Sequence, residues 1–195
     1  MNEATASGLC VRRAAAADVD ALRLLAQAVA ALPLLQRYGV QSGRLGEDLA
    51  GLARLHSDAA APANSEELWL AEDAADRRSL LGFARVLVGS ERGSGHFGRG
   101  GYLRLIALRP GENGRGVGSR LLAAVEDSVR MRHSDLFLLT SDFNQGAQRF
   151  YERAGYARVG ALPDFVHAGI TELIYWKRLL ASTTATVAAS RPHES

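Results

Sequence analysis

Residues 110–120, which read PGENGRGVGSR, place four glycines and several polar residues between an apolar run and an amphipathic one. Glycine lets a backbone adopt positive φ and approach a ligand closely. A helix that starts here leaves its first backbone N–H groups without intrahelical partners, at the positive end of the helix dipole. The segment therefore predicts an anion site, and such a turn suits a pyrophosphate best.

Two common phosphate motifs do not match this turn. A Walker A loop needs a lysine near its end, and the segment has none. The dinucleotide fingerprint needs a third glycine at position 119, where this chain has Ser119. Another phosphate-binding turn and a plain connection between a strand and a helix are the alternatives left by this segment alone.

A second segment, residues 144–156, reads NQGAQRFYERAGY and follows the turn by about thirty residues. Its Ala147, Phe150 and Tyr151 fall on adjacent faces of an expected helix, and Gly155 is placed to end that helix.

Together the two segments resemble, in order and spacing, the two signatures of the GNAT superfamily of acetyl-CoA-dependent N-acetyltransferases. Residues 113–118 are similar to the turn (Q/R)-x-x-G-x-(G/A), with Asn113 in place of the first Gln or Arg. Residues 144–156 match N-x-x-A-x-x-(F/L)-Y-x-x-x-G-(F/Y) at every defined position. The resemblance covers roughly residues 66–178, and the first sixty residues match only in outline.

The resemblance implies that two central strands splay apart and that acetyl-CoA, the co-substrate, lies between them. One strand end would pair with the pantetheine arm, the glycine turn would cradle the pyrophosphate, and Asn144 would contact the cofactor arm. Tyr151 would be the catalytic acid that protonates the leaving CoA thiolate. The implied cofactor-binding residues are Ile106, Ala107, Leu108, Asn113, Gly114, Arg115, Gly116, Val117, Gly118, Ser119 and Asn144.

The reaction that the resemblance implies is direct attack of a deprotonated amine on the thioester, without an acyl-enzyme. Many relatives place a Glu five residues before the Asn of the second signature, where this chain has Leu139. The proton acceptor is therefore open between Asp142, Glu172, His167 and the more remote Glu67. A water chain, or a substrate whose amine has a low pKa, would need none of them.

Residues 162–179 resemble family members that act on small molecules, in which the loop before the last strand closes over the acceptor. We expect Asp164, Phe165 and His167 to line that pocket, together with Tyr38 from between the first two helices. A small-molecule amine is the expected acceptor, and a peptide or protein N-terminus stays open. A non-catalytic acyl-CoA sensor or scaffold is the other alternative. Family members often form dimers, so a homodimer is consistent with the resemblance.

The order of the expected elements predicts an α/β domain with a mixed sheet. The resemblance implies that this central sheet is mostly antiparallel, with splayed central strands and flanking helices. Residues 1–180 are expected to form this one domain, and residues 181–195 a disordered tail. Expected strands are 9–13, 67–71, 79–88, 102–108, 136–140, 156–159 and 172–178, and expected helices are 19–31, 45–56, 120–131 and 144–154. Residues 34–43 are expected to be irregular, residues 89–101 a mobile connection, and strand 102–108 to be buried on both faces.

Composition excludes several other classes of protein. The chain has 195 residues, 47% of them hydrophobic, and no apolar run near twenty residues, so no membrane span is expected. The single Cys10 excludes an intramolecular disulfide, argues against a cysteine-based metal site and fits a reducing cytoplasm. The net charge of +2 is too small to indicate a nucleic-acid partner, although Lys177 is the only lysine among 23 basic residues.

Overall fold

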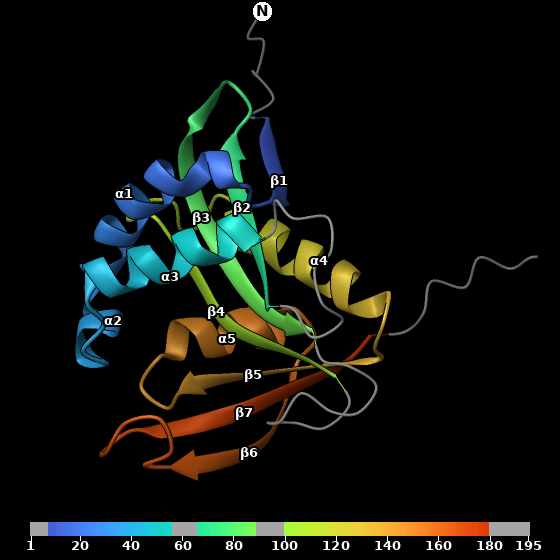
Figure 1. The fold of residues 1–195 in the computed structure, drawn as a ribbon. Coiled ribbons are helices and arrows are strands. Elements are labelled where there is room, and N and C mark those ends of the chain that lie inside the picture. The colour runs from blue at the N-terminus through green and yellow to red at the C-terminus, as the bar shows by residue number, and fades with distance from the viewer. Residues whose placement is uncertain (1–7, 56–65, 89–99, 180–195) are drawn as a thin grey trace, which may run out of the picture.

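The computed structural model describes residues 8–55, 66–88 and 100–179 (Figure 1). The expected tail 181–195, and all but the last two residues of the expected connection 89–101, lie outside the described residues. Within the described ranges, seven strands form one sheet in the order β1-β2-β3-β4-β5-β7-β6. The strands are β1 (Leu9–Arg13), β2 (Glu66–Asp73), β3 (Asp76–Val88), β4 (Gly101–Leu108), β5 (Asp135–Ser141), β6 (Ala157–Pro163) and β7 (Thr171–Arg178).

Neighbouring strands pair antiparallel throughout the sheet except at its centre, where β4 and β5 are parallel. This arrangement confirms the predicted mixed, mostly antiparallel sheet. The connection between the two parallel strands is made by a helix, as parallel pairing requires. That helix, α4 (Val117–Arg130), starts directly after the glycine turn.

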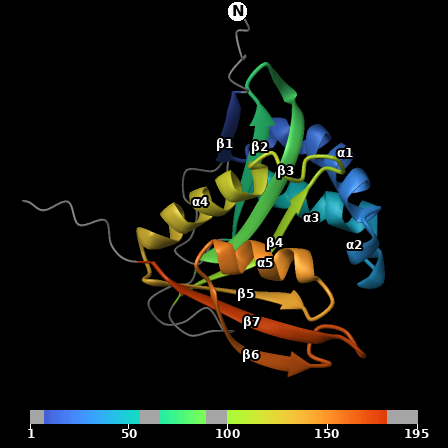
Figure 2. The same ribbon diagram turned by 180° about the vertical axis from the view of Figure 1, so that it is seen from behind.

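Helices cover the two faces of the sheet separately (Figures 1 and 2). One apolar core lies under α1 (Val19–Ala30), α2 (Pro33–Arg37) and α3 (Ser42–Leu55). The other lies under α4 and α5 (Gln145–Arg153). The glycine turn and the second signature therefore belong to the same face of the sheet, and the residues between the first two predicted helices belong to the opposite face.

Residues 34–43 are not wholly irregular, because α2 occupies Pro33–Arg37. The first helix ends at Ala30, before Pro33, and Pro33 begins the second one. A proline at the first position of a helix loses no hydrogen bond, and its φ is already suited to the helix. Tyr38 is the C-cap of the short α2, and Gly39 after it has φ 66°.

The two central strands separate after a short shared segment. β4 pairs with β5 only from Gly101 opposite Leu136 to Leu103 opposite Leu138. A Cβ on Gly101 would lie 2.7 Å from Val129 Cγ2 of α4, so glycine allows the close packing where β4, β5 and α4 meet. Gly101 thus begins an ordered strand and does not belong to the connection predicted to include it.

The prediction that strand 102–108 is buried on both faces is wrong. Arg104 is exposed, and Leu105, Ile106 and Leu108 are only partly buried. The physical reason is the separation of the strands, because residues past Leu103 have β3 on one side and no paired strand on the other. The apolar residues at the end of this strand therefore border an opening in the sheet and are not enclosed in a continuous core.

A buried carboxylate holds β1, β2 and α4 together. The Glu67 side chain is fully buried, and its Oε1 lies 2.5 Å from Arg13 Nη2 and 2.6 Å from Arg132 Nη2. Its Oε2 accepts hydrogen bonds from Ser128 Oγ at 2.5 Å and from Trp69 Nε1 at 3.1 Å. Glu67 therefore has a structural role. Both of its carboxylate oxygens are engaged by these partners, which argues against its role as the proton acceptor.

Replacing Glu67 by Gln should lower the free energy of unfolding by roughly 2–4 kcal/mol, since it leaves two guanidinium groups beside a neutral amide. Urea denaturation at pH 7 measures the change. Glu47→Gln is the matched control, because Glu47 forms an exposed ion pair with Arg23 and should cost less than about 1 kcal/mol. Equal losses in the two variants would contradict the role given to Glu67.

Candidate active site

The opening between β4 and β5 leaves a strand edge without a strand partner. On the β3 side, Ile106, Ala107 and Leu108 pair with Ala84, Phe83 and Gly82. On the β5 side, residues 104–108 have no paired strand within the described part of the chain. Backbone N–H and C=O groups at such an edge can pair with the amides of an extended ligand, as an added strand would.

A bulge lies at the start of this opening. Val86 of β3 pairs with Leu103 and Arg85 pairs with Leu105, so the register passes over Arg104. Leu103 consequently packs into the core under α4, whereas Leu105 packs into the core on the other face. Residues two apart in a regular strand share a face, so the bulge has turned the end of β4. This local twist changes which groups of β4 face the opening.

The glycine turn ends at α4 with the geometry expected of an anion cradle. Gly116 is the N-cap of α4 with φ 80°, and Gly111 and Gly114 have φ 91° and 79°. A Cβ at any of the three would meet no atom within 4 Å. Glycine is needed at these positions because of the positive φ and not because a side chain would clash. The space in front of the turn is open. The first α4 hydrogen bond runs from Arg120 N to Gly116 O at 3.1 Å.

The side chains around the cradle have partners of their own. Arg115 Nη1 lies 2.6 Å from Glu112 Oε2, and Arg120 Nη2 donates to Leu9 O at 3.1 Å. A Cβ on Gly118 would lie 3.6 Å from Phe150 Cζ, so this residue connects the cradle to α5. The backbone of the turn is thus the part that is open to a ligand. Of the other predicted cofactor-binding residues here, Asn113 and Ser119 are exposed and Val117 is buried.

The second signature forms α5 as predicted. Asn144 is its N-cap, and the Asn144 Oδ1 accepts a hydrogen bond from Ala147 N at 3.2 Å. This contact explains the asparagine structurally and leaves its side-chain NH₂ group for another partner. A contact of Asn144 with a cofactor stays a prediction.

Tyr151 lies on the α5 side of the opening and is 5% exposed. Its ring packs between those of Phe150, Tyr156 and Tyr175, with centroid distances of 5.1, 5.7 and 6.3 Å. Burial raises the pKa of the Tyr151 phenol well above its usual value, so the hydroxyl keeps its proton at neutral pH. That hydroxyl makes no hydrogen bond to a described residue, and it is therefore available to donate a proton to a ligand.

On the opposite face, the structure brings Tyr38 to the start of β7. The Tyr38 hydroxyl donates to Glu172 Oε1 at 2.5 Å, and its ring meets that of His167 edge-on at 6.4 Å. Burial and the hydrogen bond to Glu172 raise the pKa of Tyr38 to about 12. Tyr38 and His167 were both predicted to line the acceptor side. Glu172 had been considered only as a proton acceptor, because the sequence does not reveal its pairing with Tyr38.

Two other residues predicted for the acceptor side lie in the loop between β6 and β7. Asp164 has φ 55°, and its Oδ1 accepts from Gly169 N at 2.6 Å, so this carboxylate shapes the loop itself. Phe165 is 56% exposed. Roles for Asp164 and Phe165 in binding an acceptor stay predictions.

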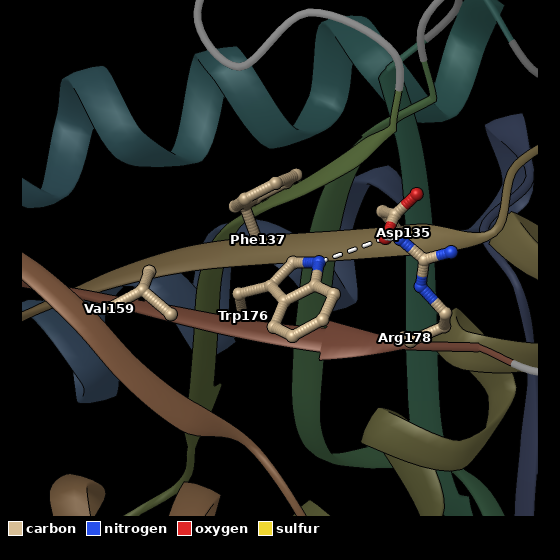
Figure 3. A pocket seen from close by; sticks show the side chains of 5 residues that line it. All are labelled: Asp135, Phe137, Val159, Trp176 and Arg178. Atoms are coloured by element: carbon tan, nitrogen blue, oxygen red, sulfur yellow. Dashed lines mark hydrogen bonds and ion pairs between the residues drawn. The ribbon is translucent and has the colours of Figure 1, made fainter.

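Two hollows are lined by elements from the second half of the chain. One, of about 410 Å³, is lined by Phe137, Val159, Trp176, Asp135 and Arg178, and Figure 3 shows Trp176 Nε1 donating to Asp135 Oδ1 at 2.9 Å. This hollow lies at the N-terminal end of β5. Ser141 and the Tyr38–Glu172 pair lie at the opposite, C-terminal end of that strand. The other, of about 300 Å³, runs between α4 and α5 and includes Ser119 of the cradle with Phe150, Arg153 and Lys177.

Among residues 8–55, 66–88 and 100–179, no group of three or more His, Cys, Asp or Glu side chains could hold a metal ion. None of the helices described is both long and apolar enough to cross a membrane.

Comparison with known families and structures supports the resemblance seen in the sequence. A model of the Acetyltransferase (GNAT) family matches residues 35–156. No curated protein matches the sequence. The match spans both signatures as well as the residues from α2 to β3.

Solved structures with the same fold include a protein from Desulfovibrio desulfuricans assigned to the GNAT family, with a TM-score of 0.66 and 24% identity over 89% of this chain and 100% of its own. The ribosomal-protein-S18-alanine N-acetyltransferase from Escherichia coli has a TM-score of 0.62 and 15% identity, covering 90% and 97%. A Salmonella typhimurium protein solved with its cofactor acetyl-CoA has a TM-score of 0.61 and 15% identity, covering 90% and 96%. These similarities show the fold.

Proposed function

The chain belongs to the GNAT acetyltransferase family, and we propose that it transfers an acetyl group from acetyl-CoA to a primary amine of a small molecule. The observation that carries this proposal is the opening between β4 and β5, with a glycine cradle at one end and a buried tyrosine beside it. An elongated ligand with a pyrophosphate at one end and amides in its arm fits these features.

Acetyl-CoA would lie along the free edge of β4, and its arm would pair with the backbone of residues 106–108. Its pyrophosphate would accept hydrogen bonds from the backbone N–H groups of residues 114–119. The hollow between α4 and α5 continues from this cradle, and Arg153 there can meet the remaining phosphate of CoA. Asn144, at the start of α5, would contact the arm through its side-chain NH₂ group.

The reaction proceeds by direct attack within a complex of enzyme, acetyl-CoA and amine. The amine nitrogen bonds to the thioester carbonyl carbon, whose oxygen is stabilised by a backbone N–H of β4. The C–S bond then breaks, and Tyr151 donates its proton to the departing sulfur. The nitrogen loses its remaining extra proton as the amide forms, and a proton taken up from water restores the phenol of Tyr151. The net reaction converts an ammonium and acetyl-CoA into an amide, free CoA thiol and one proton. Cys10 lies in β1 at the edge of the sheet and takes no part in this reaction.

A peptide or protein N-terminus is the alternative acceptor, and the Escherichia coli neighbour bears the name of an enzyme of that kind. A non-catalytic acyl-CoA sensor is the alternative outside catalysis. The available hydroxyl of Tyr151 favours the enzyme over the sensor. We further propose that residues 1–180 form the catalytic domain, and that the single cysteine suits a cytoplasmic location.

Thiol release from acetyl-CoA in the presence of a panel of amines tests the proposed function. The panel contains phenethylamine, cadaverine, kanamycin and a tripeptide with a free N-terminal alanine. At least one of the small amines should raise thiol release about 100-fold over the amine-free rate, with an acetylated product seen by mass spectrometry. Tight CoA binding without amine-dependent release across the panel would support the sensor instead.

A further inference from the structure

The last residue of β5, Ser141, lies level with the proposed reaction centre. Ser141 is three residues past Leu138, where the pairing with β4 ends, and Ile106 is three residues past its counterpart Leu103. At a rise of about 3.3 Å per residue, both lie roughly 10 Å beyond the point of separation. Ser141 and Ile106 therefore stand opposite each other across the opening. Glu172 of β7 pairs directly with Ser141 on the far side of β5.

Ser141 and Glu172 point away from the face that carries Tyr151. Leu138 and Tyr175 pack into the core under α4 and α5, together with Tyr151. Side chains alternate along a strand, so Ser141 and Glu172, each three residues away from one of these, project from the other face. Tyr38 reaches Glu172 on that same face. The phenol of Tyr151 and the carboxylate of Glu172 thus lie on opposite sides of the opening.

Ser141 and Glu172 of this cluster are buried and Tyr38 is partly buried, but the three side chains are incompletely bonded. Glu172 is 3% exposed, and its single hydrogen bond within the described residues comes from the Tyr38 hydroxyl to Oε1. Ser141 is 2% exposed, and its Oγ has no hydrogen-bond partner of normal geometry within the described residues, although it lies beside the Tyr38 hydroxyl and lowers the pKa of that phenol. Buried polar groups normally find partners, so a buried hydroxyl without one next to a carboxylate indicates a place for a ligand.

The charged groups around Glu172 leave its negative charge available to a cation. On α2, Arg37 stacks over the Phe143 ring at 3.9 Å. On β4, Arg104 forms an ion pair with Glu66 at 3.5 Å. On the same strand, the charge of Glu172 contributes to raising the pKa of Tyr102. Asp142, at the end of β5, adds a second negative charge near Tyr38, and His167 lies beside Tyr38.

From this geometry we infer that Glu172, Tyr38 and Ser141 bind the ammonium group of the acceptor, and that Glu172 accepts its proton. The inference rests on the proposed function and names the group that prepares the acceptor. Three oxygen atoms, Glu172 Oε2, Tyr38 Oη and Ser141 Oγ, match the three N–H donors of a primary ammonium. The acceptor class is therefore a protonated primary amine, and a glutamate on β7 takes the role that Leu139 on β5 cannot fill.

The proton step balances within this cluster. One N–H bond of the ammonium breaks, its electron pair stays on nitrogen, and the proton passes to the Glu172 carboxylate. The neutral amine then attacks the thioester from the face opposite Tyr151. Glu172 returns its proton to water after the amide has formed, and this is the one proton that the net reaction releases.

Glu172→Gln tests the inference with the amine of the panel that gives the fastest thiol release. At pH 7 the kcat/KM for that amine should fall about 50-fold, whereas the Kd of CoA should stay within about 3-fold. The deficit should shrink as the pH approaches the pKa of the amine, because the free amine no longer needs a proton acceptor. Tyr38→Phe keeps the carboxylate but removes one ammonium ligand, and it should raise the KM of the amine about 5-fold with little change in kcat.

Glu152→Gln is the matched control, because Glu152 accepts a hydrogen bond from the Tyr175 hydroxyl at 2.9 Å on the opposite face of the sheet. It should leave kcat/KM within about 2-fold. A loss in Glu172→Gln no larger than in this control, or a loss that stays constant with pH, would overturn the inference while leaving the proposed function intact. If no amine of the panel releases thiol from the wild type, the proposed function fails first, and the inference falls with it.

Discussion

Replacing Tyr151 by Phe is expected to lower kcat for acetyl transfer about 100-fold, near the lower end of the range for general acid catalysis. The effect should not be larger, because a thiolate is already a fair leaving group. The ring of Tyr151 lies among Phe150, Tyr156 and Tyr175, and phenylalanine preserves this packing. The hydroxyl bonds to no described residue, so its removal leaves no unpaired group in the protein. The Kd of acetyl-CoA should therefore change by less than about 3-fold.

Tyr175→Phe is the matched control for this substitution. Tyr175 belongs to the same group of rings, but its hydroxyl donates to Glu152 Oε1 at 2.9 Å. Its removal should cost about 1 kcal/mol of stability and leave kcat within about 2-fold. Steady-state kinetics and thermal unfolding of both variants separate the two effects. Equal kcat in Tyr151→Phe and the wild type would remove Tyr151 from the chemistry and leave it a core aromatic.

Replacing Gly116 by Val is expected to weaken acetyl-CoA binding at least about 30-fold, because losing one or two charge-assisted hydrogen bonds costs roughly 2–3 kcal/mol. Gly116 has φ 80°, a conformation that a β-branched residue strongly disfavours. The turn would relax and move its backbone N–H groups away from the pyrophosphate. Titration calorimetry with CoA measures the loss of affinity.

A second glycine separates backbone strain from loss of the cradle. Gly169 has φ 78°, and, as at Gly116, a Cβ there would meet no atom within 4 Å. Gly169→Val should lose similar stability but keep the Kd of CoA within about 2-fold. Acetyl transfer from S-acetyl-pantetheine, which has no pyrophosphate, should be nearly insensitive to Gly116→Val. If the variant loses as much activity with this shortened donor, the turn does not bind the pyrophosphate.

The parts of the fold that depend on local sequence were predicted well. The glycine turn, the helix after it and the helix that Asn144 begins were all expected from spacing and residue type. Each depends on neighbours within one or two turns of the chain, such as the contact from Ala147 N to Asn144 Oδ1. The mixed sheet followed from the order of the elements together with the resemblance to a known family.

The parts that depend on contacts between distant segments could not be predicted. The separation of β4 and β5 was expected from the resemblance, but the apolar sequence of residues 102–108 does not reveal that it leaves Ile106 partly exposed. The meeting of Tyr38 with Glu172 joins residues 134 positions apart and depends on the register of β7. Likewise, Glu67 looked available for proton transfer until its two arginine partners, from β1 and from beyond the end of α4, were known.

Amide hydrogen exchange with and without acetyl-CoA tests most directly whether the cofactor lies between the two central strands. Acetyl-CoA should slow exchange in residues 104–108 of β4 and residues 114–119 of the cradle, because the β4 groups that face the opening have no strand partner within the described residues and the first N–H groups of α4 have no partner in their own helix. Exchange around Trp176, in the hollow at the other end of β5, should stay unchanged. Protection confined to the hollow around Trp176, or no protection of β4 and the cradle at saturating acetyl-CoA, would contradict the account.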